Sequence, residues 1–170
     1  MISARMDCLR ESVPAARWVP AQNLHLTLFF IGALKSSRVP TLTRSLKAVF
    51  ARARPIRLSL AGPGVFPPRG RGRIAWIGVE PLKELRVLHR EVSRLLCPLL
   101  AMEEDRRLYH PHLTVARARK SWPEAMRRTL AEGFAGCHGE WRTDRGTLFR
   151  SESGPQGPLY TVVSELPMGI

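Results

Sequence analysis

The chain has 170 residues, 44% of them hydrophobic, and its 27 Lys and Arg against 14 Asp and Glu give a formal net charge of +13. This size and apolar content suit one compact domain with its own core. Three widely spaced cysteines without a CxxC pair argue against a disulfide framework and against a zinc knuckle. No apolar run approaches the roughly 18 residues of a membrane helix. Because the N-terminus also lacks a charged-then-apolar signal pattern, we expect a cytoplasmic protein that does not engage a membrane.

The positive charge has two interpretations. A sequence pI of 11.2 suits a polyanionic partner such as nucleic acid. However, 23 of the 27 basic residues are Arg, and arginines scattered over a surface are also simply solvated. Composition leaves both interpretations open.

Hydrophobic periodicity predicts alternating strands and helices along the chain. In order, these are a strand at 24–31, a helix at 40–53, strands at 56–60 and 73–79, a helix at 82–101, a strand at 112–117, a helix at 122–133, and strands near 140–150 and 158–165. The turn-rich GPGVFPPRGRGR (62–73) and SESGPQG (151–157) are predicted loops. Pro98 is expected to kink or end its helix. This order indicates an α+β domain built from two similar halves.

The helix at 40–53 is predicted to bury one face. That face carries Leu42, Leu46, Val49 and Phe50.

Two of the predicted strands carry the same short pattern. "NLHLTLFF" (23–30) and "YHPHLTVAR" (109–117) both contain H-L-T followed by Leu or Val. Successive strand side chains point to opposite faces, so His25 and Thr27 are predicted to share a polar face. The opposite, buried face of this first strand would carry Leu24, Leu26, Leu28 and Phe30.

The second stretch repeats this arrangement. Leu113 and Val115 are predicted to be buried, and His112 and Thr114 to share the polar face, with His110 on the same side. Such a short motif arises by chance in unrelated chains. Its occurrence on two predicted strands in corresponding halves favours a functional pair.

A pair of facing histidines suits proton transfer at phosphorus. Imidazole has an unperturbed pKa of about 6.5, so one histidine can deprotonate an attacking oxygen while the other protonates the leaving oxygen. A threonine hydroxyl two residues on can donate a hydrogen bond to a non-bridging phosphoryl oxygen. This chemistry requires no metal.

These stretches resemble the 2H phosphoesterases, named for two H-x-[ST]-x motifs, and within them the RNA 2′,3′-cyclic phosphodiesterases, also called 2′-5′ RNA ligase-like proteins. The resembling segments lie at 16–34, 62–80, 109–117 and 146–168 and cover nearly the whole chain in order. The resemblance implies a bilobal α+β fold with two antiparallel sheets and outer helices related by a pseudo-twofold axis. It also implies an active site in the cleft between the lobes.

The resemblance further implies an activity. His25 and His112 would be the catalytic pair, with Thr27 and Thr114 as phosphate binders. The reaction would be metal-independent and cofactor-free opening of a 2′,3′-cyclic phosphate at an RNA end to a 2′-phosphomonoester, with weak reverse joining through 2′-5′ linkages. The family pattern suggests that the first histidine protonates the leaving 3′ oxygen and that the second activates water. We expect a monomer that acts on RNA ends or related nucleotides.

One feature departs from the family pattern. Such proteins usually begin with an extra apolar strand and a helix ahead of the "RWV" segment, whereas "MISARMDCLRESVPAARWV" offers only a short helix. We therefore expect one 2H domain over 1–170 that lacks this N-terminal strand and exposes a sheet edge in one lobe.

Other residues are weaker candidates. Arg117 closes the second motif and either binds the phosphate bidentately or forms a surface ion pair. The candidates for RNA contact are His110, Arg69, Arg71, Arg73, Phe66 and Tyr109. A structural role for the histidine, a solvated loop for the arginines and packing for the two aromatic residues are the alternatives. The four tryptophans are assigned to core or helix packing: Trp18, Trp76, Trp122 and Trp141. A metal site at the three motif histidines is disfavoured, because the motif holds no carboxylate or thiolate.

Two other functions stay open. A basic RNA- or nucleotide-binding module would keep the fold without turnover, although such a module has no need of two titratable histidines. A phosphodiesterase of the same family would act instead on a small cyclic phosphate or a 2′-5′ oligonucleotide.

Overall fold

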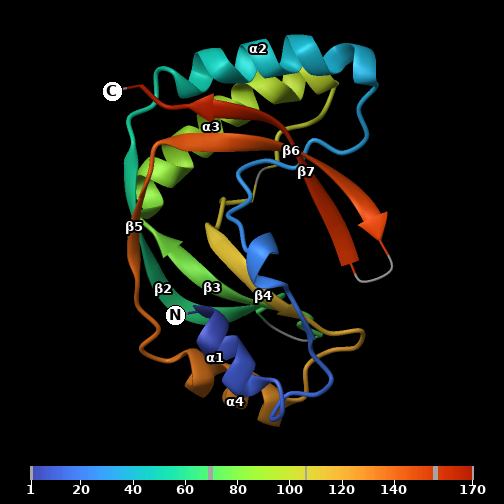
Figure 1. Cartoon of the computed structure of the whole chain (residues 1–170), viewed down its shortest axis with the longest axis vertical. Coiled ribbons are helices and arrows are strands. Elements are labelled where there is room, and N and C mark those ends of the chain that lie inside the picture. The colour runs from blue at the N-terminus through green and yellow to red at the C-terminus, as the bar shows by residue number, and fades with distance from the viewer. Residues whose placement is uncertain (1, 69–70, 106, 155–156, 170) are drawn as a thin grey trace. The chain divides into compact units, whose positions relative to one another are not determined.

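The computed structural model describes residues 2–68, 71–105, 107–154 and 157–169 (Figure 1). The helices are α1 (Ile2–Leu9), α2 (Val39–Phe50), α3 (Leu82–Leu100) and α4 (Glu124–Phe134). The strands are β1 (Arg17–Trp18), β2 (Ile56–Phe66), β3 (Ile74–Glu80), β4 (His112–Arg117), β5 (Glu140–Thr143), β6 (Arg145–Gly154) and β7 (Gly157–Pro167). They form a five-stranded sheet in the order β1-β4-β3-β2-β5 and a separate β6–β7 hairpin. The predicted α+β class with two antiparallel sheets is confirmed.

Contacts divide the chain into two compact units. The first unit comprises 1–27, 58–82 and 110–141, and the second comprises 28–57, 83–109 and 142–170. Both H-L-T motifs therefore belong to the first unit, and their geometry is a property of that unit.

The first unit has a core on one face of the five-stranded sheet. Side chains of α1, α4, β3 and β4 meet there, among them Met6, Leu9, Ala75, Ile77, Val115, Ala116, Leu130 and Phe134. We call this the core face and the opposite one the site face. Leu113, which is buried, and Val115, which is fully buried, confirm the predicted buried pair of the second motif.

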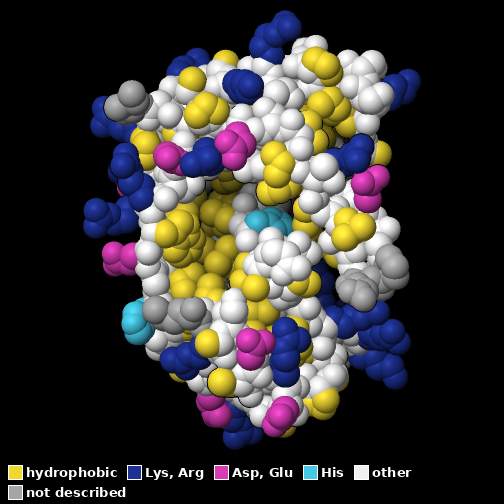
Figure 2. All heavy atoms as spheres, in the orientation of Figure 1, with side chains coloured by type: hydrophobic (Ala, Val, Ile, Leu, Met, Phe, Trp, Pro, Cys, Tyr) yellow, Lys and Arg dark blue, Asp and Glu magenta, His cyan; other side chains and the backbone are white. Residues whose placement is uncertain are grey.

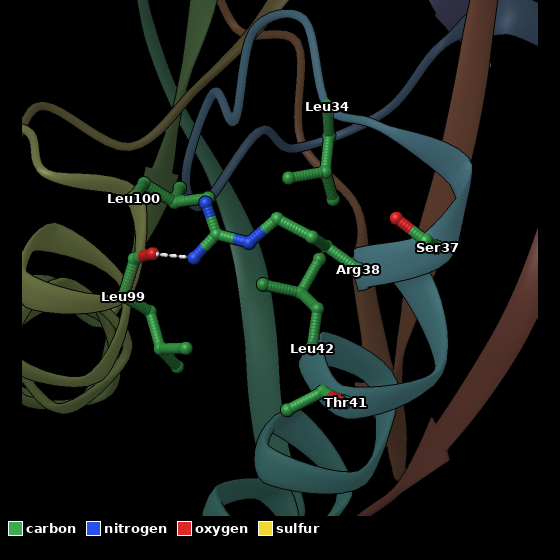
Figure 3. A pocket seen from close by; sticks show the side chains of 7 residues that line it. All are labelled: Leu34, Ser37, Arg38, Thr41, Leu42, Leu99 and Leu100. Atoms are coloured by element: carbon green, nitrogen blue, oxygen red, sulfur yellow. Dashed lines mark hydrogen bonds between the residues drawn. The ribbon is translucent and has the colours of Figure 1, made fainter.

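The second unit contains α2, α3 and the β6–β7 hairpin. The predicted helix face of α2 is confirmed, since Leu42, Leu46, Val49 and Phe50 are all buried. Arg38 precedes α2, and its guanidinium donates to the Leu99 carbonyl near the end of α3 beside a small pocket (Figure 3).

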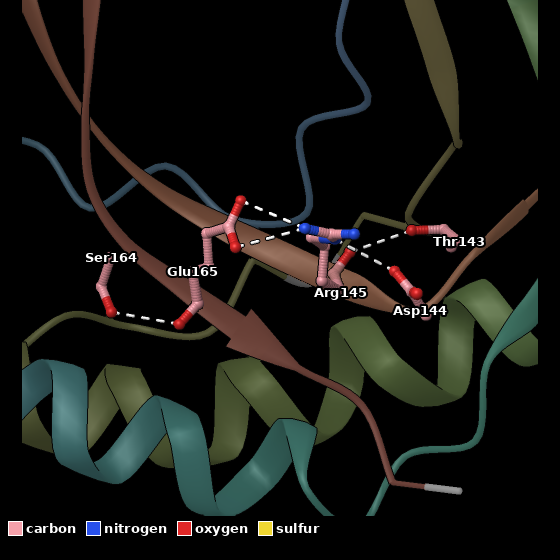
Figure 4. A network of polar contacts seen from close by, with 5 residues as sticks. All are labelled: Thr143, Asp144, Arg145, Ser164 and Glu165. Carbon is pink, nitrogen blue, oxygen red and sulfur yellow. Dashed lines mark hydrogen bonds and ion pairs between the residues drawn. The ribbon is translucent and has the colours of Figure 1, made fainter.

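The hairpin carries an exposed polar network. Arg145 donates to Asp144 at 3.0 Å and to Glu165 at 3.2 Å (Figure 4). The Thr143 hydroxyl donates to the Arg145 carbonyl at 2.9 Å. The Arg145 hydrogen bond lowers the pKa of Asp144. This network lies on the surface, where ion pairs stabilise a fold only slightly.

The strand predicted at 24–31 is wrong in length. In this segment only Leu26 is paired, through an isolated antiparallel bridge to Leu113. Phe30 was predicted on the buried face but is 77% exposed. The segment leaves the first unit after Thr27 and enters the second at Leu28, so one alternating pattern does not face a single core.

The loop predicted at 62–73 is also partly wrong, because β2 continues through 61–66. An irregularity between Leu60 and Pro63 inserts one extra residue opposite β3. Such a bulge lets a Gly- and Pro-containing stretch stay in a sheet. The Trp76 indole leaves no room for a side chain at position 64, since a Cβ on Gly64 would overlap the indole.

Smaller differences concern element ends. α3 continues through Pro98 and ends at Leu100, close to the predicted end. The strand predicted near 140–150 is two strands, β5 and β6, which belong to different sheets. The predicted SESGPQG loop is mostly strand, with β6 reaching Gly154 and β7 beginning at Gly157. Residues 155 and 156 lie outside the described part of the chain.

Candidate active site

The two motifs lie side by side on the first unit. The bridge between Leu26 and Leu113 is antiparallel, and directly opposed residues of an antiparallel pair share a face. The register therefore sets His25 beside Thr114 and Thr27 beside His112. In this crosswise register each histidine lies across from the threonine of the other motif.

Each motif histidine is anchored in the same way. Nδ1 of His25 lies 2.7 Å from the Asn23 carbonyl oxygen, and Nδ1 of His112 lies 2.7 Å from the His110 carbonyl oxygen. A carbonyl oxygen only accepts hydrogen bonds, so each Nδ1 must carry the proton and donate it. The neutral tautomer consequently leaves Nε2 as the basic nitrogen of both rings. The geometry thus prepares two Nε2 atoms for proton transfer.

Aromatic rings surround His112. The centroid of the Phe66 ring lies 5.0 Å from that of the His112 ring, edge to face, and the centroid of the Trp76 ring lies 6.1 Å from it. Phe66 and Trp76 also contact each other at 4.9 Å. These two side chains come from β2 and β3 and form an apolar wall beside the half-buried imidazole.

This environment lowers the pKa of His112 below its ordinary value of 6.5, mainly because burial disfavours the charged ring. The hydrogen bond to the His110 carbonyl acts in the opposite direction. The charges of His110, Arg117 and His25 lower the pKa further. The last of these effects places the two motif imidazoles within electrostatic reach of each other.

Comparison with known proteins places the chain in a family. Residues 1–155 match the model of the 2′-5′ RNA ligase superfamily. The chain belongs to this superfamily. An RNA 2′,3′-cyclic phosphodiesterase of Aquifex aeolicus is 32% identical over 90% of this chain and 82% of its own. One of Methanothermobacter thermautotrophicus is 30% identical over 94% of this chain and 86% of its own. Like these relatives, the chain is an enzyme of the phosphoric diester hydrolase class.

Solved structures share the fold. A protein of Thermus thermophilus superposes with a TM-score of 0.75 and 26% identity over 98% of this chain and 90% of its own. Escherichia coli LigT complexed with 3′-AMP superposes with a TM-score of 0.74 and 22% identity over 98% of this chain and 91% of its own.

The structure brings together part of the residue set predicted from the sequence. His25 and Thr114 are half-buried and Thr27 is exposed. His110 is exposed; its carbonyl anchors His112, and its ring packs 4.6 Å from Trp76. The structural role considered for His110 is thereby supported.

The remaining candidates are more dispersed. Phe66 lies beside His112, whereas Tyr109 belongs to the second unit and stacks on His89 at 4.2 Å. Arg71, Arg73 and Arg117 are exposed. Arg69 lies outside the described residues.

One site residue was assigned wrongly from the sequence. Trp76 was assigned to core or helix packing, but it faces His110 and His112 on the site face. A signal was available, because Trp76 alternates with Ala75 and Ile77, which are both buried in the core cluster. Strand periodicity therefore pointed Trp76 to the other side of β3.

The surface charge is spread out. On the face shown in Figure 2, Lys and Arg side chains cover parts of each unit, with fewer acidic side chains between them. Among the described residues, no group of three or more His, Cys, Asp or Glu side chains is placed to hold a metal ion. Within the same residues, no helix is both long and apolar enough to cross a membrane.

Proposed function

We propose that this protein hydrolyses 2′,3′-cyclic phosphate ends of RNA to 2′-phosphomonoesters, with His25 and His112 as its acid and base. Weak joining of RNA ends through 2′-5′ linkages would be the reverse of the same chemistry. The proposal is carried by two anchored imidazoles on either side of the Leu26–Leu113 bridge, each with Nε2 as its basic nitrogen. The names of the curated relatives support the substrate class.

His112 is the proposed base. Its lowered pKa keeps the ring neutral near pH 7, which a base requires. Nε2 of His112 takes a proton from water as the water oxygen bonds to phosphorus. The bond from phosphorus to the 3′ oxygen breaks, and the Nε2 proton of the His25 imidazolium passes to that oxygen. The products are a 2′-phosphomonoester and a 3′ hydroxyl.

The threonines and Arg117 are proposed to hold the phosphate. Thr27 and Thr114 each follow a residue of the Leu26–Leu113 bridge, as each histidine precedes one, so their hydroxyls can donate to non-bridging oxygens as negative charge grows there. Arg117 supplies a guanidinium from the end of β4 for a substrate phosphate.

The direct test is product analysis. The protein is incubated with a trinucleotide that ends in a 2′,3′-cyclic phosphate, with and without EDTA, and the products are separated by chromatography. We expect only the 2′-phosphate, at an equal rate in both samples. Loss of activity in EDTA that zinc restores would overturn the two-histidine mechanism. Binding of the trinucleotide without turnover would instead indicate a binding module. Turnover of 2′-5′ oligonucleotides alone would indicate the other substrate class.

A further inference from the structure

The His110 carbonyl that anchors His112 belongs to a peptide without an N–H. Its nitrogen is that of Pro111, and a proline has no backbone donor. The His110–Pro111 peptide therefore makes no hydrogen bond through its nitrogen. The direction of its carbonyl depends on how the residues on either side are held.

The C-terminal side of this peptide is held by β3. The Val79 N–H donates to the Pro111 carbonyl oxygen at 3.1 Å, next to the β3–β4 pair of Gly78 with His112. The Pro111 side chain is also fully buried. The backbone that enters β4 is thus fixed to the sheet.

The N-terminal side is held by α3. Nε of Arg86 donates to the Tyr109 carbonyl oxygen at 3.2 Å. The His89 ring stacks on the Tyr109 ring, with centroids 4.2 Å apart and planes 6° from parallel. Arg86 and His89 are three positions apart and so share a face of the helix. All three residues belong to the second unit, and the chain enters the first unit at His110.

The stack joins two neutral rings. His89 and Tyr109 are both half-buried. Burial lowers the pKa of His89, against the opposing effect of the Asp105 charge. The His89 imidazole is therefore neutral near pH 7 and packs as an aromatic ring. For this reason His89→Phe would preserve the contact, whereas His89→Ala would remove it.

The hold on Tyr109 reaches the His110 carbonyl through the backbone. A peptide between two fixed neighbours turns by opposite changes in ψ of the residue before it and φ of the residue after it. The ring of Pro111 locks that φ. The His110 carbonyl can therefore turn only if a neighbouring peptide moves as well. On the N-terminal side, that neighbour is the Tyr109–His110 peptide, whose carbonyl accepts the hydrogen bond of Arg86.

We propose that Arg86 and His89 are positioning residues for the reaction. They hold Tyr109, and through it the His110 carbonyl that selects the tautomer of His112. This assignment rests on the proposed function, in which Nε2 of His112 is the base. Without the hold, the carbonyl would turn away from Nδ1 and the ring would populate both neutral tautomers. The tautomer with its proton on Nε2 cannot accept a proton from water there.

The first test separates the hydrogen bond of Arg86 from its charge. Arg86→Met removes the donor at a similar side-chain length, whereas Arg86→Gln keeps an N–H the same number of bonds from the backbone and removes the charge. Arg86→Met should lower kcat for a 2′,3′-cyclic nucleotide about tenfold and change KM by less than about twofold, because the base is misplaced while the phosphate contacts stay. Arg86→Gln should keep most of the activity.

Arg90→Met is the matched control. Arg90 is exposed on α3, one turn beyond Arg86, and the substitution removes the same charge from the same helix. Its kcat should equal that of the unsubstituted protein. An equal loss in Arg86→Met and Arg86→Gln, or a tenfold loss in Arg90→Met, would attribute the effect to charge and overturn the proposal.

Nitrogen-15 NMR of the His112 ring reads the tautomer in the free protein. At pH 8, where the ring is neutral, Nδ1 should have the shift of a protonated nitrogen and Nε2 that of an unprotonated one. The two shifts should move toward each other in Arg86→Met and His89→Ala, and stay apart in His89→Phe. The His25 ring, which donates to the Asn23 carbonyl, is an internal reference and should not change.

The ring signals also distinguish positioning from stability. A purely structural role for the two α3 residues would lower Tm without moving the His112 shifts. Unchanged shifts in both Arg86→Met and His89→Ala would therefore overturn the proposal, whatever the effect on kcat. Failure of the unsubstituted protein to turn over the nucleotide would overturn the proposed function instead, since the NMR signals do not depend on turnover.

Discussion

His25 and His112 carry the same local hydrogen bond, from Nδ1 to the carbonyl of the residue two positions earlier. His138 makes this bond too, to the Gly136 carbonyl at 2.9 Å, yet it lies exposed in a loop. The bond orients the ring and selects its tautomer, but it does not create a site. A neighbouring threonine and a second imidazole distinguish the motif histidines from His138.

Loss of either motif imidazole should abolish most of the activity. We expect His25→Ala and His112→Ala each to lower kcat by on the order of 100-fold or more, because each removes one of two required proton transfers. Steady-state turnover of a 2′,3′-cyclic nucleotide measures this effect. His138→Ala is the matched control and should keep full activity. A loss below tenfold in both motif variants would exclude acid–base catalysis by these rings.

The apolar wall beside His112 should set the acid limb of the pH profile. A base works only when neutral, so kcat/KM falls as pH drops through the pKa of His112. Burial lowers that pKa below 6.5, which places the limb at lower pH. Phe66→Ala exposes the ring, so the pKa should rise toward 6.5 and the limb should move to higher pH.

Rate profiles and NMR titration of the His112 ring measure this shift. Phe149→Ala removes an exposed ring of the second unit and should leave the limb in place. Movement of the limb to lower pH in Phe66→Ala would show that Phe66 does not desolvate His112.

At the scale of elements, irregular pairing shapes the site face. The bulge in β2 allows 61–66 to continue beside β3, and a bulge at Val115 in β4 turns Arg117 toward the site face. Gly64 then leaves room for the Trp76 indole, which in turn packs against Phe66 and the histidines. The contact between Gly64 and Trp76 therefore supports the wall beside His112.

Filling that space should destabilise the first unit. A Cβ at Gly64 would overlap the Trp76 ring, so Gly64→Ala should cost about 1–3 kcal/mol of unfolding free energy. Gly62 is the control within the same strand, since a Cβ there meets no atom within 4 Å. Urea unfolding of the two variants tests this expectation. Equal stability of Gly64→Ala and Gly62→Ala would mean that the indole moves aside without cost.

At the scale of the molecule, 27 Lys and Arg side chains outnumber 14 Asp and Glu side chains, which leaves a net charge of +13. Basic side chains are spread over the face seen in Figure 2. Such a distribution attracts a polyanion over long distances and is screened by salt.

Salt should therefore affect RNA substrates more than mononucleotides. For single strands, log K falls by about 0.7 per contacted phosphate for each unit of log salt. We expect kcat/KM for a cyclic-phosphate trinucleotide to decline with NaCl more steeply than that for the mononucleotide. If kcat/KM declined equally with NaCl for both substrates, the basic side chains would act only on the reacting phosphate.

Local patterns were sufficient for most elements. α2, α3, β3 and β4 were predicted to within a few residues, because each packs apolar side chains on one core. The H-L-T repeats singled out the two histidines as candidates, since strand alternation separates polar from buried side chains over a few residues.

The remaining features depend on pairing between distant segments. Leu26 meets Leu113, and Arg17 meets Arg117, through a register that neither stretch encodes locally. A single extra residue at Val115 reverses which face Arg117 occupies, and alternation within the strand predicts the opposite. Side-chain types and their local periods are properties of a few neighbouring residues, whereas register, bulges and the wall beside His112 arise when the strands pack together.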